Sequence, residues 1–325
     1  ESVSTDTYST VDRWKTRVVS MGAFTISRST DVPSGQGFGY STKWDCTTAD
    51  ASPAASDRLV FEQRIEGQNL QHILKGDSSN AKKLTLSFWV KSNKTGTYIA
   101  RIYDDDNSRH IAKSYTISSA STWQKVEITY DGDTSGVLGN DNGGSLWVQL
   151  WLGAGTDWSS GTLATSWASN TNANNAVGQV NLADSTSNEF YITGCQLEVG
   201  SKATDFEFEP FQKVLNKCQR YFIKYSTGST GDRVTQAQAE GTGSAVAFFH
   251  LPTPLRAKPS VTLSDMNLRN SSSNFTISSV SGIRPDIANP PHISFSCNTS
   301  GLTSTRSYQL RMTSASGSVS INSEL

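Results

Sequence analysis

Apolar and polar residues alternate along much of this chain, which is the period of a β-strand with one buried face. In the segment 84–91 (LTLSFWVK) every second residue from Leu84 to Val90 is apolar, and the residues between them are polar except for Trp89. The same alternation predicts further strands before residue 209, at 17–27, 39–47, 58–65, 98–103, 110–117, 123–130, 145–152 and 189–199.

Helical periodicity is present in two short segments, 68–75 (QNLQHILK) and 210–220 (PFQKVLNKCQR). The second has Pro210 at its start, where a missing N–H is tolerated. Strands are predicted again after it, at 220–225, 244–250, 260–264, 274–280, 292–297 and 307–314. The sequence therefore predicts an all-β protein with a β domain over 1–209, a connecting helix over 210–220 and a second, smaller β-sandwich domain over 221–325.

Composition and charge limit the kind of partner. The chain has 325 residues, 28 Lys and Arg against 29 Asp and Glu, and a net charge of −1, so we expect no nucleic-acid partner. No apolar stretch approaches the roughly 20 residues that span a bilayer, so we expect no membrane insertion. The first residue is Glu1 and not Met, which indicates a trimmed or incomplete N-terminus.

The cysteines and histidines show no catalytic or metal-binding spacing. Four cysteines lie far apart in the sequence, at Cys46, Cys195, Cys218 and Cys297. They are interpreted as buried free thiols, with a disulfide or a metal site as the alternatives. The four histidines are expected to be surface or packing residues; they are His72, His110, His250 and His292.

An acidic run follows one predicted strand. Asp104, Asp105 and Asp106, with Asn107 and Asp141, are a weak candidate for Ca²⁺, which prefers six to eight oxygen ligands. The spacing is not that of an EF-hand, and Asp and Asn are common in hairpin turns without a metal. A solvated turn is therefore the favoured interpretation, and no cofactor is expected.

Several segments carry a resemblance to a known family: 8–14 (YSTVDRW), 61–70 (FEQRIEGQNL), 84–91, 103–109 (YDDDNSR), 176–182 (AVGQVNL) and 192–206 (ITGCQLEVGSKATDF). They resemble fibre-like virion proteins of marine and cyanobacterial bacteriophages, in which a carbohydrate-binding-module-like jelly roll lies near the end of a fibre. The motif 218–222 (CQRYF) is similar to the entry into a variable tip domain.

The resemblance implies a jelly roll over 1–209, a tip domain over 221–325, a homotrimer, other virion proteins as partners and a location on the virion. It implies recognition of a bacterial surface glycan or receptor as the function, and it brings no catalytic residues. A purely structural fibre or connector, attached to the capsid or tail and without host contact, is the alternative.

One predicted sheet face combines aromatic rings with hydrogen-bonding side chains, as sugar sites do. Its residues are Trp89, Arg101, Tyr103, Trp147, Gln149 and Trp151. The alternative is that they pack against a loop, the second domain or a neighbouring subunit. The polar stretch 153–175 is expected to form an ordered loop over the jelly roll. A glycosidase would need two carboxylates, for which Glu62 with Asp105 is the pair left open.

Overall fold

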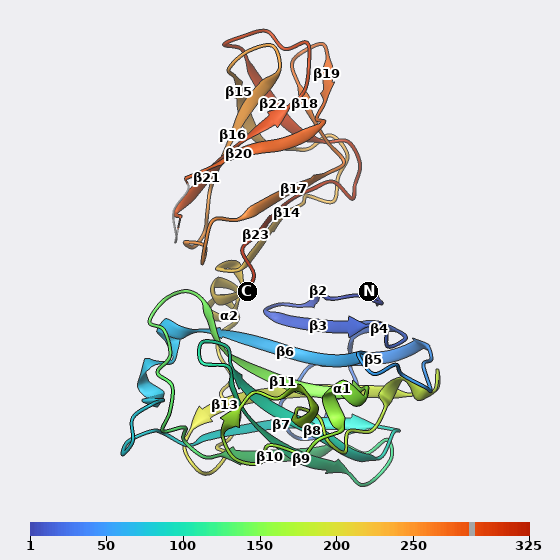
Figure 1. Cartoon of the computed structure of the whole chain (residues 1–325). Helices are drawn as coiled ribbons and strands as arrows, with labels where there is room; N and C mark the ends of the chain where they lie inside the picture. Colours follow the sequence, from blue (N-terminus) through green and yellow to red (C-terminus); the bar gives the residue numbers. More distant parts are fainter. Residues whose placement is uncertain (286–289) are drawn as a thin grey trace. The chain divides into compact units, whose positions relative to one another are not determined.

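The computed structural model describes residues 1–285 and 290–325. The chain forms two compact units, Glu1–Phe208 (unit 1) and Glu209–Leu325 (unit 2). Figure 1 colours unit 1 from blue to yellow and unit 2 from ochre to red. Each unit has a hydrophobic core of its own.

Unit 1 is a sandwich of two antiparallel sheets. Sheet A has the strand order β1-β4-β5-β13-β7-β10, with β1 at Ser2–Val3, β4 at Ala23–Ser29, β5 at Ser41–Thr48, β13 at Glu189–Val199, β7 at Leu84–Ser92 and β10 at Gln124–Tyr130. Sheet B has the order β12-β9-β8-β11-β6-β3-β2, with β12 at Ala168–Ser169, β9 at Arg109–Ile117, β8 at Gly96–Asp104, β11 at Gly144–Ala154, β6 at Arg58–Glu66, β3 at Trp14–Val19 and β2 at Thr7–Val11.

The core of unit 1 lies between these sheets and is built by the alternating residues of the strands. On β7 the alternating residues Leu84, Leu86, Phe88 and Val90 are all buried there, as the alternation predicts. Large rings complete the core, among them Trp44 and Phe190, which are fully buried. Short helical turns connect the strands: η1 (Gly67–Asn69), η2 (Gln71–Ile73), α1 (Thr156–Ser159), η3 (Asn172–Asn174) and η4 (Leu182–Asp184).

Unit 2 begins with helix α2 (Phe211–Gln219) and continues as strands. Sheet C has the order β14-β23-β17, with β14 at Phe222–Tyr225, β23 at Ser318–Asn322 and β17 at Ser260–Ser264. Sheet D has the order β19-β18-β22-β15-β16-β21-β20, with β19 at Asn274–Thr276, β18 at Met266–Arg269, β22 at Ser307–Met312, β15 at Arg233–Ala239, β16 at Ser244–His250, β21 at His292–Asn298 and β20 at Ser279–Arg284. The all-β fold class is thus confirmed.

Three predicted elements differ from the structure. The strand predicted at 17–27 is two strands, β3 and β4, because Ser20 (φ 51°) and Gly22 (φ 68°) adopt left-handed conformations that turn the chain. A Cβ on Gly22 would lie 2.3 Å from the carbonyl oxygen of Thr48, so only glycine fits this turn. The predicted strand at 274–280 is likewise split into β19 and β20.

The helix predicted at 68–75 is instead the pair of 3₁₀ turns η1 and η2, which end at the left-handed Leu74 (φ 52°). The four cysteines are free; Cys46 and Cys297 are buried, while Cys195 and Cys218 are half-buried. Among the described residues, no helix has the length and apolar character that crossing a membrane requires.

Because the two cores are separate, a core mutation should affect one unit only. Trp44→Ala is expected to lower the free energy of unfolding of unit 1 by about 3–5 kcal/mol, because it removes a buried ring. Phe295→Ala is the matched change in unit 2, where Phe295 is fully buried. Calorimetry of the full chain should show one shifted transition for each variant, and equal shifts of both transitions would contradict independent cores.

Candidate functional site

The structure brings together five of the six residues predicted to bind a glycan. Paired registers place Trp147 opposite Tyr103, Gln149 opposite Arg101 and Trp151 opposite Ile99, all on the outer face of sheet B. The prediction that Trp89 shares this face is wrong, because Trp89 lies on β7 in sheet A. Alternation shows which residues share one face of a strand, but it does not show which sheet the strand joins.

Much of this outer face is covered by the chain itself. Trp151 is 2% exposed, and its ring lies 5.9 Å from that of Trp158 on α1. Arg58 packs on Trp158, with its guanidinium carbon 4.5 Å from the ring centre. Ala176 joins the same apolar cluster. The stretch 153–175 thus forms an ordered cover here, and Trp151 cannot stack on a ligand.

Arg101 and Gln149 are also buried, in a network of side-chain hydrogen bonds. Arg101 donates from Nη1 to Gln149 Oε1 (2.6 Å), from Nε to His110 Nδ1 (3.0 Å) and from Nη2 to Asn170 Oδ1. Burial lowers the pKa of Arg101 to about 9, so it stays charged at neutral pH. Burial and the charge of Arg101 lower the pKa of His110 to about 4, so its imidazole is neutral and accepts the bond. The network holds the covering segment through Asn170.

Glu62, one of the two carboxylates considered for hydrolysis, belongs to this network. It accepts from Gln149 Nε2 at Oε2 (2.8 Å) and from Arg64 Nη2 at Oε1 (3.0 Å), and its side chain is fully buried. Asp105 lies in the exposed turn after β8. Glu62 is therefore bound to protein groups and out of reach of a substrate.

Tyr103 and Trp147 remain partly accessible on this face, where they form a small cluster with Arg64, and each of the three is half-buried. The two rings meet edge to face at 5.1 Å, and the guanidinium carbon of Arg64 lies 3.8 Å from the Trp147 ring centre. Glycan contact by Tyr103 and Trp147 stays a prediction, with Arg64 already covering part of the Trp147 ring.

The weak calcium candidate is divided in the structure. Asp104 is buried, whereas Asp105 and Asp106 lie in the exposed hairpin turn. Asp104 is paired with Lys75, and Asp106 accepts from the backbone N–H of Gly139 (2.8 Å). Within residues 1–285 and 290–325, no three His, Cys, Asp or Glu side chains gather in a way that could hold a metal.

The Lys75 ammonium occupies the position that a cation would take beside Asp104. Its Nζ also lies 3.0 Å from Asp133 Oδ2 and donates to the backbone oxygens of Ser135 (2.9 Å) and Gly136 (2.8 Å). Burial alone would raise the pKa of Asp133, but hydrogen bonds from Arg109 and Lys75 hold that pKa below its usual value. The buried acids are thus neutralised by the protein's own side chains.

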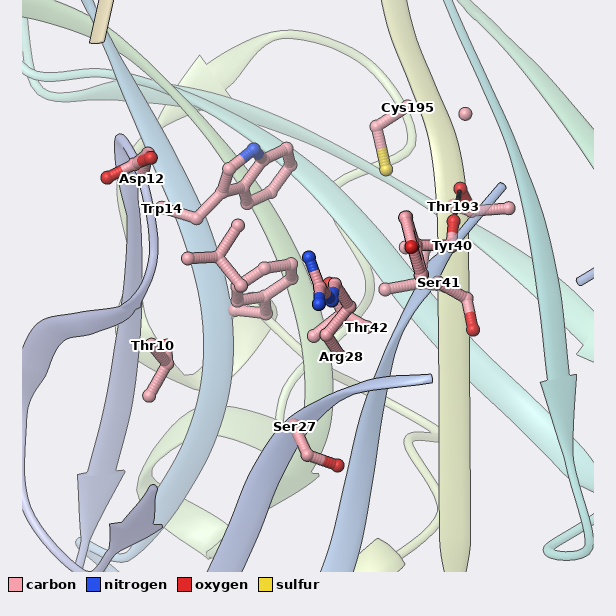
Figure 2. Close-up of a pocket in the computed structure, with 14 residues that line it drawn as sticks. Thr10, Asp12, Trp14, Ser27, Arg28, Tyr40, Ser41, Thr42, Thr193 and Cys195 are labelled. Atoms are coloured by element: carbon pink, nitrogen blue, oxygen red, sulfur yellow. Dashed lines mark hydrogen bonds between the residues drawn. The ribbon is translucent and has the colours of Figure 1, made fainter. Parts of the chain in front are cut away.

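An open cavity of about 450 Å³ is lined by residues of both sheets (Figure 2). It arises from the way β13 is paired. β13 is paired to β5 only up to Ile192 opposite Thr42, and a bulge between Thr193 and Gln196 interrupts its pairing with β7. Gly194 has φ +63°, and a Cβ there would lie 2.5 Å from the ring of Phe38. The bulge therefore depends on glycine.

Apolar residues form the inner wall of the cavity. Trp14 follows the tight β2–β3 turn and stacks on Phe61 with ring centres 4.4 Å apart and planes 20° apart. Ile192 and Cys195 line the opposite sheet. Burial raises the pKa of Cys195 to about 12, so the thiol stays protonated and is no nucleophile at neutral pH.

Polar groups form the rim. Tyr40 is 52% exposed, and the guanidinium carbon of Arg28 lies 4.4 Å from its ring centre. Thr42 lies opposite Arg28 on the same face of sheet A, and in the described part of the chain its hydroxyl has no hydrogen-bond partner. Ser27 alternates with Arg28 on β4, and its hydroxyl points away from the cavity (Figure 2). The hydroxyl of Thr193 is bonded within the protein, because it donates to the backbone oxygen of Tyr40 (2.9 Å). The cavity thus combines aromatic rings, the hydroxyl of Thr42 and a guanidinium, with Asp12 as the carboxylate in its lining.

Sequence reasoning missed this site. Trp14 stands in the YSTVDRW motif, which contributed to the family resemblance and not to the predicted glycan site, and Tyr40 and Arg28 stand in separate segments. One signal was available: Gly194 interrupts a strand pattern, and an isolated glycine in a strand often marks a bulge.

Comparisons with known proteins give only distant likenesses. No protein-family model matches the sequence, and the comparison with curated proteins finds no relative. Among solved structures, the enzymatically active domain of tailspike protein 4 of bacteriophage CBA120 is 14% identical, with a TM-score of 0.32; the match covers 57% of this chain and 19% of that one. The alignment therefore spans about a fifth of the tailspike chain.

Two carbohydrate-binding modules are similar to a comparable extent. A family 4 module is 13% identical over 62% of this chain and 95% of its own, with a TM-score of 0.32. The family 11 module from Clostridium thermocellum, in complex with a β-1,3-1,4-mixed-linked tetrasaccharide, is 15% identical over 57% and 89%, with a TM-score of 0.31. Likenesses this low do not transfer a function, which must rest on the cavity itself.

The buried ion pairs of Lys75 give a stability prediction. Lys75→Met should destabilise unit 1 by about 3–5 kcal/mol, because it leaves Asp104 buried without its cation. The exposed pair of Lys83 with Asp131 (2.8 Å) provides the control, and Lys83→Met should cost less than about 1 kcal/mol. Urea unfolding measures both. Equal losses for the two variants would contradict the role given to burial.

Proposed function

We propose that unit 1 is a non-catalytic glycan-binding module and that it binds a sugar in the cavity beside Trp14. One observation carries this: the rings of Trp14 and Tyr40 share an open cavity with the unbonded hydroxyl of Thr42 and with Arg28. Its volume of about 450 Å³ lies within the range of small-molecule sites.

This combination suits a sugar for a physical reason. A pyranose ring has apolar C–H faces and a polar edge of hydroxyls, so it is bound best by an aromatic surface next to hydrogen-bonding groups. The hydroxyl of Thr42 can donate and accept, and Arg28 can only donate. Glycoside hydrolysis uses two carboxylates, whereas the cavity lining offers Asp12.

The wider role that we propose is host recognition by a phage fibre or spike, in which unit 1 contacts a bacterial surface glycan and unit 2 is the tip. Such a module gains avidity when several copies act together, because each further contact is intramolecular. Helix α2 supports assembly: none of its residues is buried, Phe211 is 78% exposed and Val214 is 41% exposed. We propose that this apolar face packs against its copies in a homotrimer on the virion.

A structural fibre or connector without host contact is the second candidate. The exposed apolar face of α2 supports this candidate as well as it supports host recognition, because assembly alone would explain that face. Glycan binding at the cavity separates the two candidates, since a connector has no need of a sugar site.

Tyr40→Ala tests the cavity. Tyr40 is half exposed, so its removal should spare the fold, yet it should weaken glycan binding by about tenfold to a hundredfold, by analogy with the loss of one stacking ring. A glycan array that includes host polysaccharides identifies the ligand, and calorimetric titration measures the affinity.

Trp147→Ala is the matched control on the outer face of sheet B. It should leave the affinity unchanged if the cavity is the site. Loss of binding in Trp147→Ala alone would place the glycan on sheet B and overturn the assignment to the cavity. Absence of glycan binding by the wild-type chain would favour the connector.

The assembly proposal is tested at the first residue of α2. Phe211→Asp introduces a charge into the exposed apolar face and should convert the trimer into monomers, as measured by light scattering or analytical ultracentrifugation. Gln212→Asp, one residue further, adds the same charge next to that face and should leave the trimer intact. A wild-type chain that is monomeric would contradict the proposal.

A further inference from the structure

Arg28 is positioned by its ring contact and leaves its donors unused. Its guanidinium carbon lies 4.4 Å from the centre of the Tyr40 ring, which is a cation–π contact. Stacking uses the flat face of the guanidinium, whereas its N–H groups lie in the plane and point sideways. Across residues 1–285 and 290–325, these N–H groups form no hydrogen bond or ion pair with the chain.

Three lysines of sheet A and its loops are paired. Lys43 Nζ lies 2.6 Å from Glu189 Oε1, Lys91 pairs with Asp31, and Lys94 pairs with Asp184. Arg28 differs from these lysines because it is oriented without being neutralised. A guanidinium held by one face has a planar pair of donors that matches the two oxygens of a carboxylate.

The place of Arg28 in the cavity agrees with this chemistry. Figure 2 shows the guanidinium of Arg28 in the middle of the cavity, between the ring of Trp14 and the side of Tyr40 and Ser41, whereas Asp12 lies beyond Trp14 at the β2–β3 turn. An anionic group of a bound sugar would therefore contact Arg28. Asp12 would lie near the opposite end of the sugar ring, where the hydroxyls of the sugar can donate to it.

From this geometry we infer that the cavity binds an acidic sugar, a pyranose that carries a carboxylate or another oxyanion. This inference rests on the proposed glycan-binding function and adds the class of glycan. The oxyanion accepts hydrogen bonds from the Arg28 guanidinium, the sugar ring lies against Trp14, and the hydroxyl of Thr42 bonds a ring substituent. A uronate and a sulfated sugar share this chemistry, so the test distinguishes them.

The experiment compares acidic glycans with matched neutral ones on the full chain. An array carries oligogalacturonate and oligomannuronate, each beside its carboxyl-reduced form, and sulfated galactan beside its desulfated form. Calorimetric titration then compares the wild type with Arg28→Gln, Arg28→Lys and Asp12→Asn. Arg28 is exposed, so these changes should spare the fold.

The wild type should bind an acidic oligosaccharide about tenfold or more tightly than its neutral counterpart, as expected for charge-assisted hydrogen bonds. Arg28→Gln should abolish that difference, Arg28→Lys should retain part of it, and Asp12→Asn should not reduce it. The difference should also shrink as salt concentration rises, because the attraction between exposed charges is screened.

The outcomes separate the inference from the function on which it rests. Equal binding of acidic and neutral forms, unchanged in Arg28→Gln, overturns the inference while a loss in Tyr40→Ala still supports glycan binding at the cavity. No binding to any glycan overturns both. A preference for the sulfated galactan that depends on Arg28 supports the oxyanion site and assigns sulfate as its source.

Discussion

Backbone pairing along β13 is the constraint on which the candidate site depends. β13 is paired with β5 only as far as Ile192, and the bulge around Gly194 interrupts its pairing with β7 between Thr193 and Gln196. A sandwich closed along its whole length would bury Trp14 between the sheets. Because the pairing stops, the Trp14 ring faces an open space and the side chains of β4 reach its rim. A cavity is therefore created without any strand leaving the sheet order.

The outer face of sheet B illustrates the opposite outcome. It has the aromatic and amide side chains that a sugar site needs, but the segment after β11 returns over it and uses most of them. Trp151 packs with Trp158, and Arg101 finds three acceptors, one of them on the covering segment at Asn170. Satisfying buried polar groups in this way fixes the segment in place, since an unbonded donor there would cost free energy. Composition alone cannot distinguish such a network from a binding face.

Much of the fold, and little of the site, could be predicted from the sequence. Alternation identified strands such as β7 and β13, because one buried face leaves a period of two. It could not identify the turn at Ser20, where a non-glycine residue adopts a left-handed conformation, or the 3₁₀ turns that end at Leu74. Trp89 was grouped with the wrong sheet because alternation does not encode strand order. Tyr40 and Trp14 come from segments that are brought together only by the pairing of distant strands, so the sequence pattern does not predict that they lie close together.

Arg28 and Arg101 show how the same residue type serves two purposes in one unit. Both lie on strands and both contact a tyrosine ring, at 4.4 Å for Tyr40 and 4.5 Å for Tyr103. Arg101 is buried and its donors are bonded to Gln149, His110 and Asn170, so its removal would leave acceptors unsatisfied within the protein. Arg28 is exposed and its donors are free in the described structure. The ring contact orients each guanidinium. Where its N–H groups are bonded within the protein the arginine stabilises the fold, and where they are free the arginine can bind a ligand.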